Sequence, residues 1–318
     1  MRITVLGSAA GGGFPQWNCN CRNCAGLRAG TLRTKARTQS SIFIRPDGGA
    51  DGVLFNASPD ILAQIRANPE LQPGRALRDS AIAGVVLMDG QIDHVTGLFM
   101  LRERSRPAPE RPGGRAPDPL PLWCTDAVAE DLTTGHPVFR VLGHYCGVDR
   151  HAIALDGTPF EVPGVPDLLF RAMPLDSKAA PYSPHRERGE PGDNLGITVT
   201  DRRSGGRLFY APGLAAVTPA VFDAMSNADA VMVDGTFWTD DEMITTGAGP
   251  QRARAIGHLP QSGEGGMLEV MARLPAATRK LLIHINNTNP ILDEDSAPRA
   301  EVARAGVEVC EDGMHIEL

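Results

Sequence analysis

The sequence predicts an α/β protein in which helices cover mixed β-sheets. Short apolar segments bounded by glycine recur and are typical of buried strands: Ile3–Leu6, Ser41–Ile44, Val53–Phe55, Ile82–Met88, Leu168–Met173, Ile197–Thr200, Leu208–Tyr210, Val231–Val233 and Leu281–Ile285. Helix patterns lie between several of them, at Asp126–Thr133, Pro219–Ser226, Glu264–Leu274 and the segment that Ser58-Pro59 opens. A hairpin turn at Ser204-Gly205-Gly206 interrupts the alternation, so a pure βαβ repeat is not expected.

Length and charge narrow the class of protein. The 318 residues suffice for one large domain or two medium ones. No apolar run approaches the ~20 residues of a membrane span, and the chain starts with a strand pattern, Arg2-Ile3-Thr4-Val5-Leu6, rather than a leader. We therefore expect a soluble, cytoplasmic protein. A net charge of −7 without a lysine-rich run argues against nucleic-acid binding.

The segment 102–121 is rich in arginine and proline. Such a composition cannot bury an apolar face. We predict a flexible surface loop here. RNA binding is disfavoured because the segment has no aromatic side chain on which a base could stack.

Three of the six cysteines, Cys19, Cys21 and Cys24, are spaced C-x-C-x-x-C. Thiolates at this spacing in a loop can converge on one tetrahedral zinc ion. The alternative is that the three cysteines are reduced and bind no metal. The spacing leaves the fourth zinc ligand open among Cys310, His315, Asn286 and Asn287.

Glycine dominates Gly7–Gly13, directly after the first predicted strand. The segment lacks the Lys-Ser/Thr pair and the following helix of a phosphate-binding P-loop. We interpret it as a tight turn.

Polar side chains follow two buried strands. Asp89-Gly90-Gln91-Ile92-Asp93-His94 comes after one of them, and His284 ends the other. Sites in layered α/β folds form at strand ends, so Asp93, His94 and His284 make a candidate 2-His-1-carboxylate set, which suits non-haem Fe(II). The alternatives are that Asp93 caps a helix beginning at His94 and that His94 is structural.

Further candidates lie in two later segments. His258 precedes a predicted helix and could transfer protons, although a surface histidine is an equal alternative. The polar segment 174–194 carries Lys178, His185, Arg186 and Arg188. These cations could bind a ligand with several carboxylates, but a solvated loop explains them as well.

Motifs along the whole chain carry a family resemblance: LGSAAGGGFPQWNCNCRNC, QIDHVTGL, PYSPHRERGEPGDNLG, VDGTFW, GHLPQSGEGGMLEV and HINNTNPILDEDS. They resemble a family of the metallo-β-lactamase superfamily that takes part in making pyrroloquinoline quinone (PQQ). The resemblance implies a single domain, 1–318, folded as an αββα sandwich of two mixed sheets flanked by helices.

The resemblance also implies which metal ligands are kept. The superfamily pattern H-x-H-x-D-H places histidines where this chain has Asp89 and Gln91. A third histidine is replaced at Asp176-Ser177, and a bridging aspartate at Ala211-Pro212-Gly213. One metal position is thereby lost, and Asp93, His94 and His284 remain for the other.

Relatives with the C-x-C-x-x-C loop resemble phosphodiesterases that complete their zinc with a histidine three residues after the His284 position. Asn287 stands there in this chain. The resemblance therefore implies a structural zinc with Asn287 as fourth ligand, through its amide oxygen.

The activity that the resemblance implies is hydroxylation of the tyrosine ring of a cross-linked Glu–Tyr precursor, and with the candidate ligands we expect it to depend on iron and O₂. In this hypothesis His258 transfers protons and Asp89 and Gln91 lie next to the metal. Substrate carboxylates bind the side chains of Lys178, His185 and Arg186. Other proteins of the PQQ pathway are possible partners.

Three alternatives remain at this stage. The protein could carry PQQ or its precursor and assist its transport, it could be a metallohydrolase, or both metal sites could be purely structural. The residue types do not select iron, because the same three ligands also accept Zn, Mn or Cu.

Overall fold

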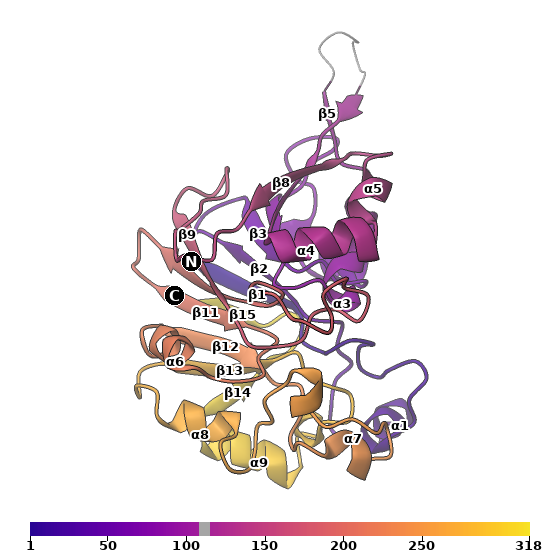
Figure 1. Ribbon diagram of the computed structural model, residues 1–318, viewed down its shortest axis with the longest axis vertical. Helices are drawn as coiled ribbons and strands as arrows, with labels where there is room; N and C mark the ends of the chain where they lie inside the picture. The colour runs from indigo at the N-terminus through magenta and orange to yellow at the C-terminus, as the bar shows by residue number, and fades with distance from the viewer. Residues whose placement is uncertain (108–114) are drawn as a thin grey trace.

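Two mixed β-sheets lie face to face in the computed structural model, which describes residues 1–107 and 115–318 (Figure 1). The first sheet runs in the order β15 (His315–Glu317), β1 (Arg2–Gly7), β2 (Ser41–Arg45), β3 (Gly52–Phe55), β4 (Ile82–Val86), β7 (Leu120–Cys124), β8 (Val148–Ala152). The second runs β14 (Val307–Val309), β13 (Arg279–Ile283), β12 (Ala230–Asp234), β11 (Arg207–Ala211), β10 (Leu195–Asp201), β9 (Leu168–Pro174). The short connections β2–β3 and β10–β11 join antiparallel pairs, and strands connected through helices, such as β4–β7 and β11–β12, pair parallel. The pairs β1–β2 and β9–β10 are also antiparallel, although long segments lie between their strands.

Helices cover the outer face of each sheet (Figure 1). The first sheet is covered by α2 (Ile61–Ala67), α3 (Ile92–Val95), α4 (Asp126–Glu130) and α5 (Val138–Leu142). The second is covered by α6 (Pro219–Ser226), α8 (Met267–Ala272) and α9 (Ala297–Arg304). The helices α1 (Arg22–Ala29) and α7 (Glu242–Thr245) lie together at one end. Short helical turns complete the set at Pro69–Leu71, Thr96–Leu101, Asp131–Gly135, Arg254–Ile256 and Pro290–Leu292.

The core has three layers, one between the sheets and one under each helix layer. Phe55 of the first sheet packs on Phe170 and Tyr210 of the second, with ring centroids 6.0 and 5.8 Å apart. Strands between two apolar layers bury both faces, which explains why they appear in the sequence as continuous apolar runs. Each fully buried large side chain contributes about 1.5–3 kcal/mol. These layers confirm the αββα sandwich expected from the resemblance.

All nine predicted strands are present. Among the described residues the prediction missed β7, an interior strand of the first sheet, and the short or edge strands β5 (Ser105–Pro107), β6 (Arg115–Pro117), β8, β14 and β15. The strand β8 was not predicted because its sequence, VDRHA, is polar and mostly solvent-facing. The helix α2 begins at Ile61, two residues later than Pro59, because the Ser58 hydroxyl accepts the backbone N–H of Asp60 in a turn before the helix. The helix α8 begins at Met267 rather than Glu264, since Gly265 has a φ of 66°.

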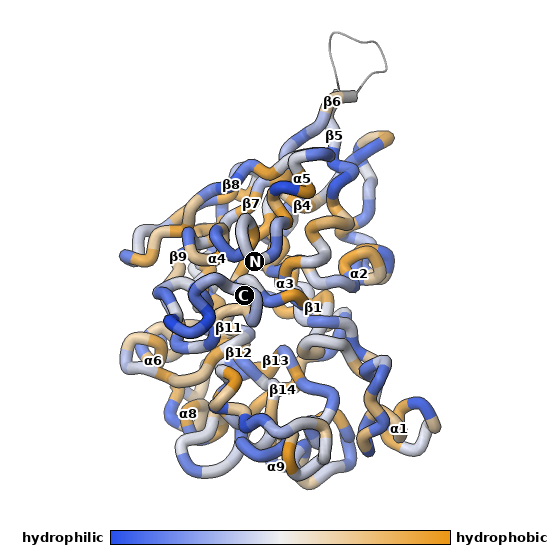
Figure 2. Tube along the Cα trace, turned by 45° about the vertical axis from the view of Figure 1, so that its right-hand side comes forward, coloured by the Kyte–Doolittle hydropathy of each residue, from blue (hydrophilic) through white to orange (hydrophobic). Residues whose placement is uncertain are grey.

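The predicted loop 102–121 contains a hairpin that the composition did not indicate. The strands β5 (Ser105–Pro107) and β6 (Arg115–Pro117) pair antiparallel and project from the rest of the molecule (Figures 1 and 2). Residues 108–114 lie outside the described residues. Among the described helices, none combines the length and apolar character that crossing a membrane requires.

Candidate metal centre

Three predicted ligands converge where strands of both sheets end. Asp93 and His94 lie on α3, and His284 directly follows β13. Their ligand atoms all lie within 4.8 Å of one another. The Oδ2 of Asp93 is 3.3 Å from Nε2 of His284 and 3.7 Å from Nε2 of His94. Side chains nearly 200 positions apart in the sequence thus form one cluster, as the strand-end argument predicted.

Asn56 and Ala57, which follow β3, connect α3 with the residues after β4. The side-chain oxygen of Asn56 accepts the N–H of Met88, and the carbonyl of His94 accepts the N–H of Ala57. The helix starts at Ile92 with Gln91 as the preceding residue. The proposed capping role of Asp93 is therefore wrong, because Asp93 lies inside the helix with its carboxylate facing His284.

His284 adopts a left-handed backbone conformation with a φ of 60°. This region is unfavourable for a residue with a Cβ, and such conformations concentrate at functional sites. The conformation ends β13 and turns the imidazole toward Asp93. The local strain therefore accompanies the placement of a candidate ligand.

Each imidazole has a second polar group behind it. The Nδ1 of His94 lies 2.7 and 2.9 Å from the two carboxylate oxygens of Asp89, and Nδ1 of His284 lies 2.8 Å from the hydroxyl of Thr236. Binding at Nδ1 leaves Nε2 of both rings for a metal, as in carboxylate–histidine–metal arrangements. The Nε2 of His94 is buried and has no hydrogen-bond partner. These side chains therefore fit a bound divalent metal ion.

The charges at the site are strongly coupled. Burial alone would lower the pKa of His94, but the carboxylates of Asp89 and Asp93 outweigh it and raise that pKa to about 9. Burial would raise the pKa of Asp93, and the charges of His94 and His284 instead hold it far below its usual range. A metal ion that binds His94 must displace a proton, so binding strengthens as the pH rises.

His258 forms a dyad with Asp234 beside this cluster. Its Nδ1 lies 2.6 Å from Oδ2 of Asp234, and its ring stacks on that of His284 at 5.6 Å. Asp234, His258 and His284 could also hold a metal by proximity. However, both oxygens of Asp234 already accept hydrogen bonds from Leu214, Thr236 or His258. We therefore interpret Asp234 as the partner of His258 rather than as a ligand.

Asp234 and His258 each favour the charged form of the other. Burial opposes the charged form of either group, but their mutual attraction outweighs it, so that the pKa of His258 is raised and that of Asp234 is lowered. An imidazolium half-buried against a carboxylate can donate a proton to a bound molecule.

The remaining predicted site residues occupy different places. The side chain of Gln91 donates to the carbonyl of Lys178 at 3.3 Å. Lys178 is exposed, and its backbone lies against Gly257, the neighbour of His258: a Cβ on Gly257 would be 3.0 Å from the backbone nitrogen of Lys178. Lys178 and Gln91 are thus at the rim of the centre.

Arg186 and His185 are turned to protein groups. The guanidinium of Arg186 donates to the carbonyl of Ala179. The ring nitrogens of His185 face two carboxylates, 3.4 Å from Asp131 and 3.0 Å from Asp193. A histidine between two carboxylates does not suit the carboxylate-binding role predicted for it, and we do not retain that role.

The three cysteines of the C-x-C-x-x-C segment converge on Asn287. Its side-chain amide nitrogen lies 3.0, 3.6 and 3.4 Å from the sulfurs of Cys19, Cys21 and Cys24. Amide nitrogen and oxygen exchange places on rotation, so the same side chain can present its oxygen to a metal. His315 contacts Thr4 instead. Of the four possible fourth ligands, the structure brings Asn287 to the thiols.

The thiols differ in acidity. Burial would raise the pKa of Cys19, but hydrogen bonds from Cys21, Cys24 and Asn287 outweigh it and lower that pKa. Burial raises the pKa of Cys24 to about 11. All six cysteines are free of disulfides, as both the metal-binding role and the alternative of reduced thiols without a metal require.

Sequence reasoning missed several residues of the centre. Asp234 and Thr236 follow β12 in the same way that Asp89 follows β4, so the strand-end rule could have found them. Gly11 was interpreted only as part of a turn. A Cβ on Gly11 would lie 3.3 Å from the carboxylate of Asp93, so this glycine lets the turn approach a candidate ligand closely.

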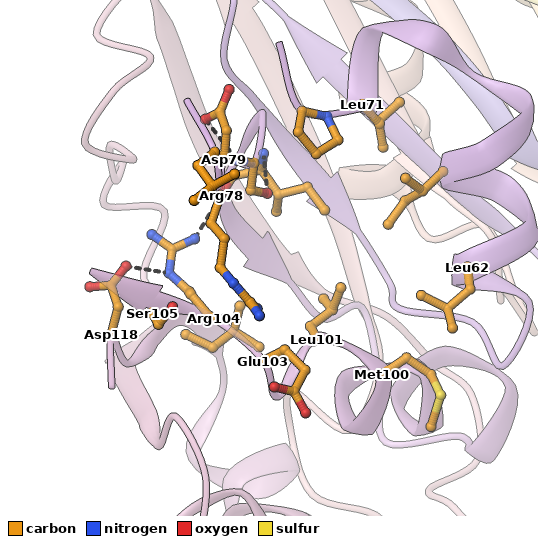
Figure 3. Close-up of a pocket in the computed structure, with 16 residues that line it drawn as sticks. Leu62, Leu71, Arg78, Asp79, Met100, Leu101, Glu103, Arg104, Ser105 and Asp118 are labelled. Atoms are coloured by element: carbon orange, nitrogen blue, oxygen red, sulfur yellow. Dashed lines mark hydrogen bonds and ion pairs between the residues drawn. The ribbon is translucent and has the colours of Figure 1, made fainter. Parts of the chain in front are cut away.

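A cavity of about 570 Å³ lies on the outer side of the first sheet, between α2 and the β5–β6 hairpin (Figure 3). Leu62, Leu71 and Met100 form an apolar side, and Arg104 pairs with Asp118 at 2.8 Å on the opposite side. None of the predicted site residues lines this cavity. Its volume therefore has no bearing on the metal centre.

The four-layer fold with candidate metal ligands at strand ends defines the class of protein. Residues 52–285 match the model of the beta-lactamase superfamily domain. Among solved structures, Zn(2+)-bound PqqB from Methylobacterium extorquens is similar with a TM-score of 0.88 and 38% identity, covering 100% of both chains.

Two curated relatives specify the family. Coenzyme PQQ synthesis protein B of Azoarcus sp. (strain BH72) is 62% identical over 318 residues, covering 100% of both chains. The protein of the same name from Cupriavidus necator is 57% identical, covering 99% of both. The chain belongs to the family of coenzyme PQQ synthesis protein B within the beta-lactamase superfamily, which confirms the expected resemblance.

Proposed function

We propose that the protein is an enzyme of PQQ biosynthesis that oxidises the tyrosine ring of a cross-linked Glu–Tyr precursor with O₂ at an iron(II) centre formed by Asp93, His94 and His284. The observation that carries the proposal is the buried, unpartnered Nε2 of His94, which faces Asp93 beside His284. Two imidazoles and one carboxylate leave further coordination positions open, a set that suits non-haem iron oxygenases. The pathway follows from the name of the relatives.

An iron(II) ion bound by these ligands would supply the activation of O₂. The residues of the chain bind and orient the substrate and move protons. His258 is held at Nδ1 by Asp234, so its Nε2 is the atom that exchanges protons with the ring hydroxyl. We assign the attraction of substrate carboxylates to Lys178, an exposed cation whose backbone lies next to Gly257.

The overall oxidation balances without a further reductant. A phenol ring and one O₂ give a quinone and one water, since the ring gains one oxygen atom and loses two hydrogen atoms. The second oxygen atom leaves as water with those two hydrogens. Proton transfer through His258 is thus needed at both the ring hydroxyl and the departing water.

A metallohydrolase is less well supported by the geometry. Hydrolysis in two-metal sites requires ligands for both ions. Asp89 is bound to His94, Gln91 is bound to a carbonyl, and Ala211 has no polar side chain. Two metals per chain within this centre would revive the hydrolase alternative.

The test is reconstitution without oxygen. Metal-free protein is loaded with Fe(II), mixed with the cross-linked Glu–Tyr dipeptide and exposed to O₂. We expect O₂ uptake and a product with one more oxygen atom and two fewer hydrogen atoms. His284→Ala should lose both signals, whereas His151→Ala, a change at an exposed pair with Asp149, should keep them. Full iron loading without O₂ uptake would refute the proposal.

A further inference from the structure

Asp131, His185 and Asp193 form a second buried cluster, away from the ligands of the candidate centre. Asp131 begins the π-helical turn after α4, and the other two lie on the long segment before β10. Their ligand atoms lie within 4.8 Å of one another. Asp131 is 1% exposed and Asp193 3%. The three residues thus bring two carboxylates and an imidazole together in the interior.

Most polar atoms of this cluster lack hydrogen bonds. Both carboxylate oxygens of Asp131, both ring nitrogens of His185 and Oδ1 of Asp193 are buried without a hydrogen-bond partner among the described residues. The carboxylates lie 3.0–3.4 Å from the ring nitrogens, as ion pairs that require a protonated imidazole. Buried polar atoms are normally satisfied, and a cluster of unsatisfied ones indicates an ion or water between them.

The charge of the cluster also indicates a cation. Two buried carboxylates carry two negative charges, and no lysine or arginine of the described chain pairs with either of them. A protonated His185 would neutralise only one. A divalent cation with neutral imidazole balances both charges, which removes the cost of a buried unpaired charge. Burial raises the pKa of Asp131 and of Asp193, as expected for carboxylates that lack a sufficient counter-charge.

We propose that Asp131, His185 and Asp193 bind a divalent metal ion such as Zn²⁺ or Mn²⁺, at a site separate from both the iron centre and the cysteine cluster. Mixed carboxylate and imidazole ligands suit these borderline ions better than Ca²⁺ or Cu⁺. The proposal goes beyond the proposed function and does not depend on it. An inactive protein could still bind this metal.

The site connects two segments that border the candidate centre. Gly90 lies directly against Asp131, since a Cβ on Gly90 would come within 2.8 Å of Oδ2 of Asp131. On the other side, the hydroxyl of Tyr182 donates to the carbonyl of Gly90. A metal at this position ties the segment that carries Tyr182 and His185 to the turn after α4. It thereby fixes Gly90, the residue that follows Asp89.

The experiment counts metal ions. Wild-type protein is dialysed against low-micromolar Zn²⁺ and then against metal-free buffer, and the bound metal is measured by mass spectrometry. We expect three ions per chain in the wild type and two in Asp131→Asn and in His185→Ala. His94→Ala should also retain two, including the one at this site, so that His94→Ala/His185→Ala retains one. His151→Ala is the matched control and should retain three.

Folding of each variant is checked by circular dichroism, because a buried carboxylate is being changed. If the variants do not fold, anomalous diffraction from wild-type crystals soaked in Zn²⁺ decides. A peak between Asp131 and His185 supports the site, and its absence while the cysteine cluster is filled overturns it. Equal metal content in His185→Ala and wild type would overturn the proposal too and would make the cluster an imidazolium between two carboxylates.

Discussion

Asp89→Asn should weaken metal binding at the Asp93/His94/His284 centre by about tenfold. Both oxygens of Asp89 contact Nδ1 of His94, at 2.7 and 2.9 Å, and the residue is 4% exposed. Asparagine keeps one acceptor oxygen and loses the charge. Hydrogen bonds to charged groups contribute about 1.5–3 kcal/mol and neutral ones about 0.5–1.5. The difference of about 1–2 kcal/mol corresponds to roughly 5–30-fold in the dissociation constant.

The assay is titration of Mn²⁺ followed by electron paramagnetic resonance. One equivalent of Zn²⁺ per chain is added to metal-free protein first, because the thiolates of the cysteine cluster bind it in preference to the imidazole and carboxylate ligands. Only the binding class that His94→Ala abolishes is compared between variants. Asp312→Asn is the matched control, because this buried carboxylate binds Ser8 and Thr38 instead of a histidine. Equal affinity in Asp89→Asn and wild type, or an equal loss in Asp312→Asn, would refute the orienting role of Asp89.

Three other changes test separate features. In Gly11→Ala the new Cβ would lie 3.3 Å from the Asp93 carboxylate, so the carboxylate should shift by a few tenths of an ångström. Mn²⁺ binding should weaken severalfold as a result. Gly74→Ala is the control, because the space around Gly74 is open, and it should leave Mn²⁺ binding unchanged. Burial raises the pKa of Glu242 to about 7 from 4.5, so the folded protein binds the extra proton between these values and loses stability as the pH rises through them. Glu242→Gln should therefore raise the free energy of unfolding by about 3 kcal/mol at pH 8 but by only about 1 kcal/mol at pH 5, measured by urea denaturation; a pH-independent effect would contradict this. Asn287→His should raise zinc affinity of the cysteine cluster at least about tenfold in chelator competition, since imidazole is a better zinc ligand than an amide; unchanged affinity would mean that position 287 is not a ligand.

The sequence predicted the parts of the fold that a local pattern can carry. Apolar runs such as Ile82–Met88 are long enough to identify strands that are buried on both faces. The edge strand β8 was not predicted, because its side chains face solvent and its sequence is polar. The start of α8 was placed too early because no local pattern indicates that Gly265 takes a left-handed conformation.

The residues of the candidate site were also predicted only where a local sequence pattern indicates them. Asp93, His94 and His284 were predicted because each follows a buried strand, which is a local signal. His185 was interpreted as a substrate-binding cation because its sequence neighbours are arginines. Its partners in the structure are Asp131 and Asp193, which belong to a helical turn and to a later part of the segment. Only the packing of α4 on that segment brings these residues together, and no spacing rule expresses it.

Asp89 bears on both metal positions of the superfamily: it replaces a ligand of one, and it contacts a candidate ligand of the other. The resemblance marks this residue as the replacement of a metal-binding histidine, which on its own suggests a vestige. In the structure it is buried and directs both oxygens at Nδ1 of His94. A carboxylate behind a metal-binding imidazole fixes the ring and makes it a stronger ligand. One substitution thus removes a ligand from a two-metal centre and strengthens the single centre that remains, so the pattern of changes favours a working one-metal site over a decayed two-metal site.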